Sequence, residues 1–284
     1  MQIKISSGGY TAAADTHGAE LVSFKSPDNT EYIWQADPDV WQRHAPVLFP
    51  FVCSTHSKTY TVNGVKYKMS NHGFARDSEF EVLSQTDSSV TFILKADDAT
   101  KALYPYDFEF CVTYELNGSR LSVTFSAVNK GSGTMYCFIG GHPGFNCPLT
   151  EGETFEDYRV KYEKAETVVQ KLADKTVTVA DNTDTVPLTR ELFANDVFMK
   201  QSPNSSEISL IGGKSGRGVT VSYDKSGCIA VWSPYNEKAS FVCLEPWTSV
   251  PIYCEDTEEL TEMKNAVQIP AGGKYDFKFD IDIF

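Results

Sequence analysis

Residues 108–128 read FEFCVTYELNGSRLSVTFSAV, and this stretch decides the fold class. Apolar residues occupy every second position on both sides of Asn117-Gly118, which is the period at which side chains alternate between the two faces of a β-strand. An Asn-Gly pair between two such runs favours a two-residue turn, because both residues tolerate the positive φ angles that the turn requires. The stretch therefore predicts a β-hairpin with one buried face.

The same alternation continues along the rest of the chain and predicts further strands at residues 2–6, 80–83, 90–94, 219–223 and 275–281. A second Asn-Gly pair, Asn63-Gly64, separates TyrThrVal from ValLysTyr and predicts a second hairpin. Helical periodicity is scarce. It predicts only short connecting helices, at residues 99–103, 188–194 and 257–264, and none of them is long enough to cover a sheet.

Many strands joined by turns, without alternating strand–helix units, are typical of packed antiparallel sheets. We therefore expect an all-β fold, a large antiparallel β-sandwich with a few short helices. The polar residues 201–207 are followed directly by renewed alternation, so we interpret them as a surface loop and not as a linker. Residues 1–284 are accordingly predicted to form a single domain, because all-β sandwiches often exceed the usual domain size.

The composition limits the classes of partner. Hydrophobic residues make up 41% of the chain, including 18 Phe, 14 Tyr and 4 Trp, which is enough for a large core and an aromatic cleft. The formal net charge of -13 repels nucleic acid and anionic membrane surfaces, so we expect neither as a partner. The start of the chain lacks the apolar segment of a secretory signal, and no stretch predicts a membrane span. These features favour a cytoplasmic protein that binds a small molecule.

The chain has seven cysteines, an odd number, which we interpret as mostly reduced core residues. Cys53 and His56 have a spacing that metal ligands use, but no second close pair completes a structural zinc site, and we predict no metal. The glycine pairs at 140–141 and 212–213 lack the partners of a phosphate loop or a dinucleotide fold, so no nucleotide cofactor is predicted either.

Three segments depart from plain strand-and-turn sequence, namely NHGFARD at 71–77, GGHPGFN at 140–146 and LEPW at 244–247. Each places a titratable residue, His72, His142 or Glu245, among glycine, proline or aromatic neighbours. Glycine allows sharp turns and close approach of a ligand, and Pro143 biases His142 toward an extended conformation. Taken singly, such residues are more often structural than functional, so the three segments carry weight only in combination.

Together these segments resemble the aldose 1-epimerase family, and more closely its branch of shorter bacterial proteins that are often called LacX-like. The most specific strings are HGFARD at 72–77 and GHPGF at 141–145, and weaker similarity continues at 18–21, 49–52, 231–233 and 245–247. The resemblance covers nearly the whole chain. It implies a galactose mutarotase-like β-sandwich, an open cleft that binds an aldose, and no cofactor.

The resemblance also implies roles for the three titratable residues. His142 corresponds to the family's general acid and Glu245 to its general base, while His72 corresponds to a second histidine that helps to hold the ring oxygen. From their positions next to these residues we expect three aromatic side chains to pack against the sugar, namely Phe74, Phe145 and Trp247. The sequence does not place the sugar-binding aspartate that longer members of the family have.

One departure from the family pattern concerns the sugar site. After Phe-Pro-Phe-Val the family usually continues with Gly-Arg, and that arginine lies in the sugar site, whereas this chain has Cys53-Ser54. Either Arg76, His56 or Lys58 takes over the arginine's hydrogen bonds, or the substrate differs, or the activity has weakened. We include Arg76 among the predicted substrate-binding residues.

The implied activity is that of an isomerase that interconverts the α and β anomers of a hexose by acid/base ring opening. The C1 hydroxyl must lose a proton while the ring oxygen gains one, so a carboxylate and a protonated imidazole suit the reaction. With ordinary pKa values of about 4.3 and about 6.5, the active state is expected between those values. A nearby carboxylate is expected to raise the His142 pKa and widen that range.

Three alternatives stay open at this point. A hexose-6-phosphate 1-epimerase would have the same fold, with arginines and lysines gathered around a phosphate. A non-catalytic sugar-binding or regulatory protein could keep the sandwich without turnover. A glycoside hydrolase would need a second carboxylate beside Glu245, for which the sequence offers no evident candidate. The sequence indicates neither the particular aldose nor the pathway, and it does not distinguish a monomer from a homodimer.

Overall fold

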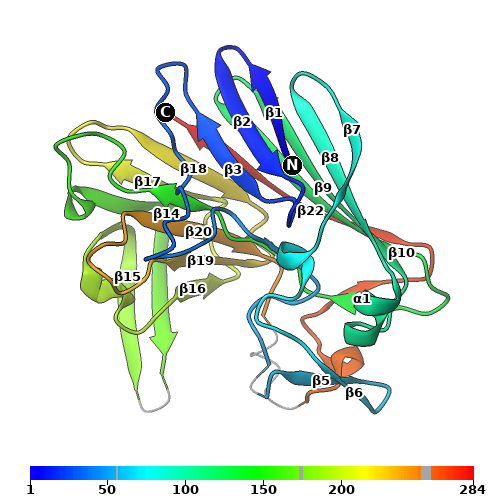
Figure 1. Ribbon diagram of the computed structural model, residues 1–284. Helices are drawn as coiled ribbons and strands as arrows, with labels where there is room; N and C mark the ends of the chain where they lie inside the picture. Colours follow the sequence, from blue (N-terminus) through cyan, green and yellow to red (C-terminus); the bar gives the residue numbers. More distant parts are fainter. Residues whose placement is uncertain (56, 173–174, 251–256) are drawn as a thin grey trace.

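Two large antiparallel sheets form the body of the protein (Figure 1). The computed structural model describes residues 1–55, 57–172, 175–250 and 257–284. Within these residues, nine strands form the larger sheet in the order β15 (Thr176–Pro187), β14 (Tyr158–Lys171), β17 (Glu207–Gly212), β18 (Gly218–Tyr223), β22 (Lys274–Ile283), β10 (Arg120–Asn129), β9 (Phe108–Asn117), β8 (Ser89–Lys95) and β7 (Glu81–Gln85). The predicted all-β fold is therefore confirmed.

The second sheet carries the segments that the sequence singles out for chemistry. Its strands within the described residues are β16 (Phe198–Gln201), β19 (Cys228–Trp232), β20 (Phe241–Trp247), β12 (Gly140–Gly141) and β4 (Val47–Leu48), with β13 (Gly144–Asn146) also paired to β20. Both β12 and β13 pair with β20, so residues 140–146 run antiparallel to it along its whole length.

Smaller sheets flank these two layers. They consist of β1 (Gln2–Ser7), β2 (Tyr10–Asp15) and β3 (Leu21–Lys25); of β5 (Thr59–Val62) and β6 (Val65–Lys68); and of β11 (Met135–Cys137) and β21 (Val267–Ile269). The first of them contacts β8 and β9 of the nine-stranded sheet, and the hairpin of β14 and β15 extends away from the body (Figure 1). All seven strand ranges that the sequence predicts fall on observed strands, to within one or two residues.

One of the three predicted helices is confirmed and two are shorter than predicted. Within the described residues only α1 (Asp98–Leu103) is α-helical, and it starts with a capping box in which the Asp97 side chain accepts from Thr100 N–H at 2.7 Å. The other two predicted helices are reduced to the 3₁₀ turns η3 (Arg190–Phe193) and η5 (Leu260–Glu262). Two more such turns are η1 (Ala75–Asp77) and η2 (Phe155–Asp157). Short segments of this kind lack the length to offset helix nucleation.

The two Asn-Gly hairpins differ in outcome. Asn63-Gly64 forms the predicted turn, with φ angles of 51° and 77°. The prediction at Asn117-Gly118 is wrong by one residue, because Asn117 pairs with Arg120 and the turn is Gly118-Ser119. Only Gly118 has a positive φ, 58°, as the first central position of a type II′ turn requires. This register sets buried Leu116 opposite buried Leu121, and a turn one residue earlier would pair Leu116 with a polar residue.

The two sheets pack through one apolar core, in which Phe125 and Phe279 of the larger sheet lie 5.6 Å apart between ring centroids. Gly141 of β12 faces this core, and a Cβ atom at that position would lie 2.7 Å from the Phe279 ring. Glycine therefore allows β12 to approach the larger sheet closely at the place where the chain continues into His142.

The described cysteines agree with the prediction made for them. The six described cysteines are all free thiols, and four of them are buried, which matches the prediction of reduced core residues; Cys254 lies outside the described residues. Within the described residues, no helix has the length and apolar character that crossing a bilayer would require.

Gly140 offers a test of the packing behind the second sheet. A Cβ atom there would lie 2.4 Å from Trp247 Cδ1 and 3.2 Å from Val52, so Gly140→Ala overfills a closed core. We expect it to lower the free energy of unfolding by about 1–3 kcal/mol, measured by urea denaturation. Gly133→Ala is the matched control, because no atom lies within 4 Å of its Cβ position. Equal urea midpoints for the two variants would contradict this packing.

Candidate active site

Strand register brings His142 and Glu245 together. Gly140 pairs with Trp247 and Gly144 pairs with Cys243, and the same register continued between them sets His142 opposite Glu245. Residues directly opposite in antiparallel strands have side chains on the same face of the sheet. The His142 Nε2 atom accordingly lies 3.1 Å from Glu245 Oε2. Two residues a hundred positions apart are thus held as one pair by backbone hydrogen bonding.

The pair is buried. The Glu245 side chain is 1% exposed and that of His142 is 10% exposed. Apart from the contact with His142, the Glu245 carboxyl accepts no hydrogen bond from the described residues, although both of its oxygens are buried. Burying a carboxyl group with so few partners costs stability. Such an arrangement in a native fold is a mark of a functional position.

Burial also decides the protonation of the pair. It raises the pKa of Glu245 well above its ordinary value, and the nearby Asp196 charge raises it further. Burial lowers the pKa of His142 well below its ordinary value, with smaller contributions from His72 and Arg76. Both directions favour a neutral pair that shares one proton. The expectation that the carboxylate raises the His142 pKa is therefore wrong in this structure, because desolvation outweighs the attraction between the charges.

His72 lies against the pair, with its ring 5.5 Å from that of His142 in an edge-on arrangement. Its backbone has a φ of 66°, and its N–H donates to Cys53 O at 2.8 Å. In return Cys53 N–H donates to His72 Nδ1 at 3.0 Å. Burial, with Arg76 and Arg43, lowers the His72 pKa to about 3. A neutral ring whose Nδ1 accepts must carry its proton on Nε2, so His72 is a hydrogen-bond donor in a fixed orientation.

Aromatic side chains that the sequence analysis missed surround His142. Its ring lies 5.2 Å from Trp41 and 5.6 Å from Trp232, and Trp41 also stacks on Phe241 at 5.1 Å. Trp232 Nε1 donates to Asp196 Oδ1 at 2.7 Å, which places this aspartate at the same site. Trp232 falls on one of the strings that carry the family resemblance, but Trp41 and Asp196 follow no motif and could be located only by the fold.

The loop that carries Trp41 is held by a buried carboxylate. Glu20 Oε1 accepts from the backbone N–H groups of His44 at 2.6 Å and Ala45 at 2.9 Å. Because Glu20 belongs to a turn between β2 and β3, these two bonds tie the N-terminal sheet to the edge of the site. These hydrogen bonds help to hold the loop that places Trp41 beside His142.

Two arginines lie near the histidines. Arg76 contributes to the lowered pKa of both His72 and His142, and its Nε is buried without a hydrogen-bond partner among the described residues. Arg43 Nη1 donates to Arg76 O at 3.2 Å, and its Nη2 lies 2.6 Å from Asp77. Of the three residues expected to replace the family's arginine, Arg76 is thus the one that lies near the His142–Glu245 pair. Lys58 is exposed, and His56 lies outside the described residues.

The aromatic residues that we expected to contact a sugar lie in the core. Phe145 has no exposed surface, Trp247 is 2% exposed and Phe74 is 8% exposed. Trp247 packs against Gly140, and Phe74 packs against Phe49. Trp247 is two residues from Glu245 on β20, so strand alternation places both side chains on the same face. The three aromatic side chains are buried, as Glu245 is, and their contact with a sugar stays a prediction.

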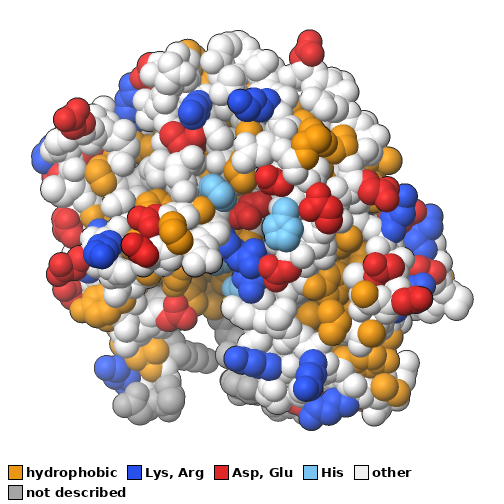
Figure 2. Space-filling model, viewed as in Figure 1, with side chains coloured by type: hydrophobic (Ala, Val, Ile, Leu, Met, Phe, Trp, Pro, Cys, Tyr) orange, Lys and Arg blue, Asp and Glu red, His pale blue; other side chains and the backbone are white. Residues whose placement is uncertain are grey.

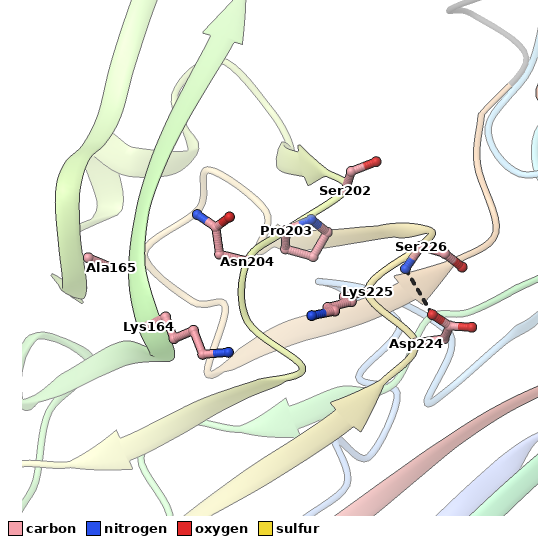
Figure 3. A pocket seen from close by; sticks show the side chains of 8 residues that line it. All are labelled: Lys164, Ala165, Ser202, Pro203, Asn204, Asp224, Lys225 and Ser226. Carbon is pink, nitrogen blue, oxygen red and sulfur yellow. Dashed lines mark hydrogen bonds between the residues drawn. The ribbon is translucent and has the colours of Figure 1, made fainter.

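Charged and histidine side chains gather near the middle of the molecular face drawn in Figure 2. A separate open depression of about 770 Å³ lies between β14 and the loops that follow β16 and β18 (Figure 3). In that view Lys164 and Lys225 extend toward the same space, and Asp224 accepts from Ser226 N–H at 2.9 Å. The depression contains neither a histidine nor a buried carboxyl group, so it lacks the groups for acid/base chemistry.

One set of donor atoms within the described residues has the composition of a metal site. A ligand atom each from His142, Cys243 and Glu245 lies within 4.8 Å of the others. Of the pair whose spacing the sequence noted, Cys53 is described and burial raises its pKa to about 12, while His56 lies outside the described residues.

Comparison with known proteins agrees with the resemblance seen in the sequence. The profile of a family described as aldose 1-epimerase matches residues 1–278. The plasmid-encoded protein LacX of Lactococcus lactis subsp. lactis is 32% identical over 286 residues, with 95% of each chain covered. A galactose mutarotase related enzyme from Lactobacillus acidophilus superposes with a TM-score of 0.92 at 33% identity, covering 100% of this chain and 97% of that one.

A galactose mutarotase-like protein from Lactobacillus casei gives a TM-score of 0.90 at 27% identity, with both chains covered completely. The similarity to these proteins extends over the sheets that hold the His142–Glu245 pair and is not confined to one motif. The chain belongs to the aldose 1-epimerase family.

Proposed function

We propose that this protein is a mutarotase, an aldose 1-epimerase that interconverts the α and β anomers of a hexose by opening the ring, with His142 and Glu245 as its proton-transfer pair. The observation that carries the proposal is the 3.1 Å separation of His142 Nε2 and Glu245 Oε2 on one face of the second sheet. Membership in the aldose 1-epimerase family supports an enzyme of the isomerase class.

The spacing of the pair suits the reacting atoms. The hydroxyl oxygen O1 and the ring oxygen O5 of an aldopyranose are bonded to the same carbon, so the groups that serve them must lie side by side. Glu245 takes the proton from O1 while His142 gives one to O5, which breaks the C1–O5 bond and leaves the open aldehyde. Rotation about the C1–C2 bond and closure with the roles exchanged gives the other anomer.

Sugar binding would prepare this protonation state. In the neutral pair the shared proton lies toward the carboxyl group, because burial opposes charge. A sugar hydroxyl that donates to the unpaired Glu245 oxygens favours the ionised carboxylate, and the proton then moves to His142. His72, neutral and with its proton on Nε2, is positioned to donate to a ring or hydroxyl oxygen without exchanging a proton.

Substitution of either member of the pair tests the proposal. We expect Glu245→Gln and His142→Asn each to lower the rate of mutarotation about 10²–10⁴-fold, since each removes one positioned proton transfer. The measurement is polarimetry on fresh α-D-glucose and α-D-galactose. His17→Asn serves as the control, because the His17 side chain is more than half exposed and lies 3.8 Å from Glu79 at the surface. Unchanged rates in both pair variants would rule out the pair, and sugar binding without any turnover would favour a non-catalytic binding protein.

The pH profile provides a second test, with the sign set by the two pKa shifts. In the active state the two residues share one titratable proton. Activity therefore falls in acid, when His142 binds an additional proton, and in alkali, when Glu245 releases the shared proton. Asp196 raises the Glu245 pKa, so Asp196→Asn should move the alkaline limb of kcat/KM to lower pH. If the limbs had their ordinary assignment, with Glu245 titrating in acid, the same substitution would move the acid limb instead.

A second candidate, a hexose-6-phosphate 1-epimerase, is favoured by one observation. Arg43 and Arg76 both lie near the histidines, and the buried Arg76 Nε–H donates to no acceptor among the described residues. Guanidinium groups suit the recognition of phosphate oxygens. Asp77 offsets part of this charge through its contact with Arg43, so we rank this substrate second.

Rates on glucose and glucose 6-phosphate separate the two candidates. If a phosphate binds at the arginines, Arg43→Gln should raise KM for glucose 6-phosphate about tenfold or more, the loss of one charge-assisted pair, and leave KM for glucose unchanged. Lys58→Gln is the matched control, because it removes an exposed cation of the neighbouring loop. Equal effects of Arg43→Gln on both sugars would assign Arg43 to the site's structure and not to phosphate recognition.

A further inference from the structure

Three potential metal ligands converge on one face of the second sheet. Cys243 and Glu245 are two residues apart on β20, so their side chains share a face, and the register of residues 140–146 sets His142 opposite Glu245. One donor atom from each residue lies within 4.8 Å of the other two, and all three residues are buried. Because two strands of one sheet hold these donors, their mutual positions are fixed by backbone hydrogen bonds.

We propose that His142, Cys243 and Glu245 form a binding site for a thiophilic divalent cation of the Zn²⁺ class, and that the bound cation blocks the sugar-ring chemistry of the same pair.

The identity of the donors selects the class of cation. An imidazole nitrogen, a thiolate and a carboxylate oxygen suit Zn²⁺ and related transition metals, whereas Mg²⁺ and Ca²⁺ prefer oxygen ligands alone. In a tetrahedral zinc site the metal lies about 2.0–2.3 Å from each ligand, so the three donor atoms must close in by about an ångström.

The charge balance also favours a divalent cation. Burial raises the pKa of the Cys243 thiol and of the Glu245 carboxyl, and the Glu245 charge raises the Cys243 pKa further. A divalent cation removes this penalty, because the thiolate and the carboxylate together neutralise its charge in the buried site. At neutral pH the binding step releases about two protons to solvent, one from the thiol and one from the His142–Glu245 pair.

The Glu245 carboxyl is prepared for a ligand of this kind. It is 99% buried, and apart from His142 it accepts no hydrogen bond from the described residues. Binding of a cation would supply the missing partner. The same coordination uses the imidazole nitrogen and the carboxylate that ring opening requires, so the cation inhibits and does not assist proton transfer.

Titration of the metal-free, reduced, full-length protein with Co²⁺ tests the site directly. We expect a near-ultraviolet thiolate-to-cobalt charge-transfer band at one equivalent, and its loss when Zn²⁺ displaces the cobalt. Cys243→Ser should abolish the band and weaken Zn²⁺ binding at least tenfold by calorimetry. Cys111→Ser is the matched control, because Cys111 is a half-buried thiol on β9 of the other sheet. It should retain both the band and the affinity.

Absence of the band in the wild type, or its persistence in Cys243→Ser, would overturn the proposal. Far-ultraviolet circular dichroism and urea midpoints establish that each variant is folded, and the wild-type titration stands without any variant. Zn²⁺ should also inhibit mutarotation by the wild type and by Cys111→Ser, with recovery after chelation. A cobalt band in a protein that has no mutarotase activity would support the metal site and refute the proposed function, so the two can fail separately.

Discussion

The antiparallel register between β20 and residues 140–146 is the constraint on which the site depends. Gly140 opposite Trp247 and Gly144 opposite Cys243 leave His142 only one place, opposite Glu245. If residues 140–146 slipped by one position along β20, the imidazole of His142 would turn to the other face of the sheet, away from the Glu245 carboxyl. Several neighbours reinforce this register: Gly140 admits the Trp247 ring, Gly141 admits Phe279, and both contacts leave no room for a side chain at either glycine.

The site buries a carboxyl group and two imidazoles with few hydrogen-bond partners, and this burial lowers the stability of the fold. An interior of this kind favours neutral forms, and it does so here for both members of the pair and for His72. These three groups are therefore uncharged without a ligand, and they become charged only when a ligand supplies compensating hydrogen bonds or charge. A sugar hydroxyl and a divalent cation would do this in different ways, which is why one cluster can serve proton transfer and also bind metal.

Much of the fold could be predicted from the sequence, because period-two alternation is a local signal that is clear in strands such as β9, β10 and β22. The two longest strands, β14 and β15, were not predicted, and β20 is buried at every position and shows no alternation. The three titratable residues of the site were also identifiable, since glycine and proline mark each of them. The turn at Gly118-Ser119 was misplaced because pairing of Leu116 with Leu121, a non-local preference, decides it.

Other features of the site required the fold itself. Trp41 and Asp196 lie beside the pair through loops without a motif, and the burial that sets the pKa of His142 and Glu245 is a property of the packed sheets. Phe145 and Trp247 were expected at the ligand from their positions in the sequence alone, and the fold shows that both side chains are buried.

Two hydrogen bonds join the backbone of Cys53 to His72, one to the backbone N–H of His72 and one to its imidazole. His72 is oriented by the peptide groups of residue 53 and not by its side chain, so the identity of residues 53 and 54 can vary while the imidazole stays in place. Cys53 also adopts a φ of 55°, a conformation that glycine reaches without strain and that costs a side-chain-bearing residue about a kilocalorie per mole or more. In this segment, which departs from the family pattern, the backbone of residue 53 and not its side chain therefore orients the imidazole of His72.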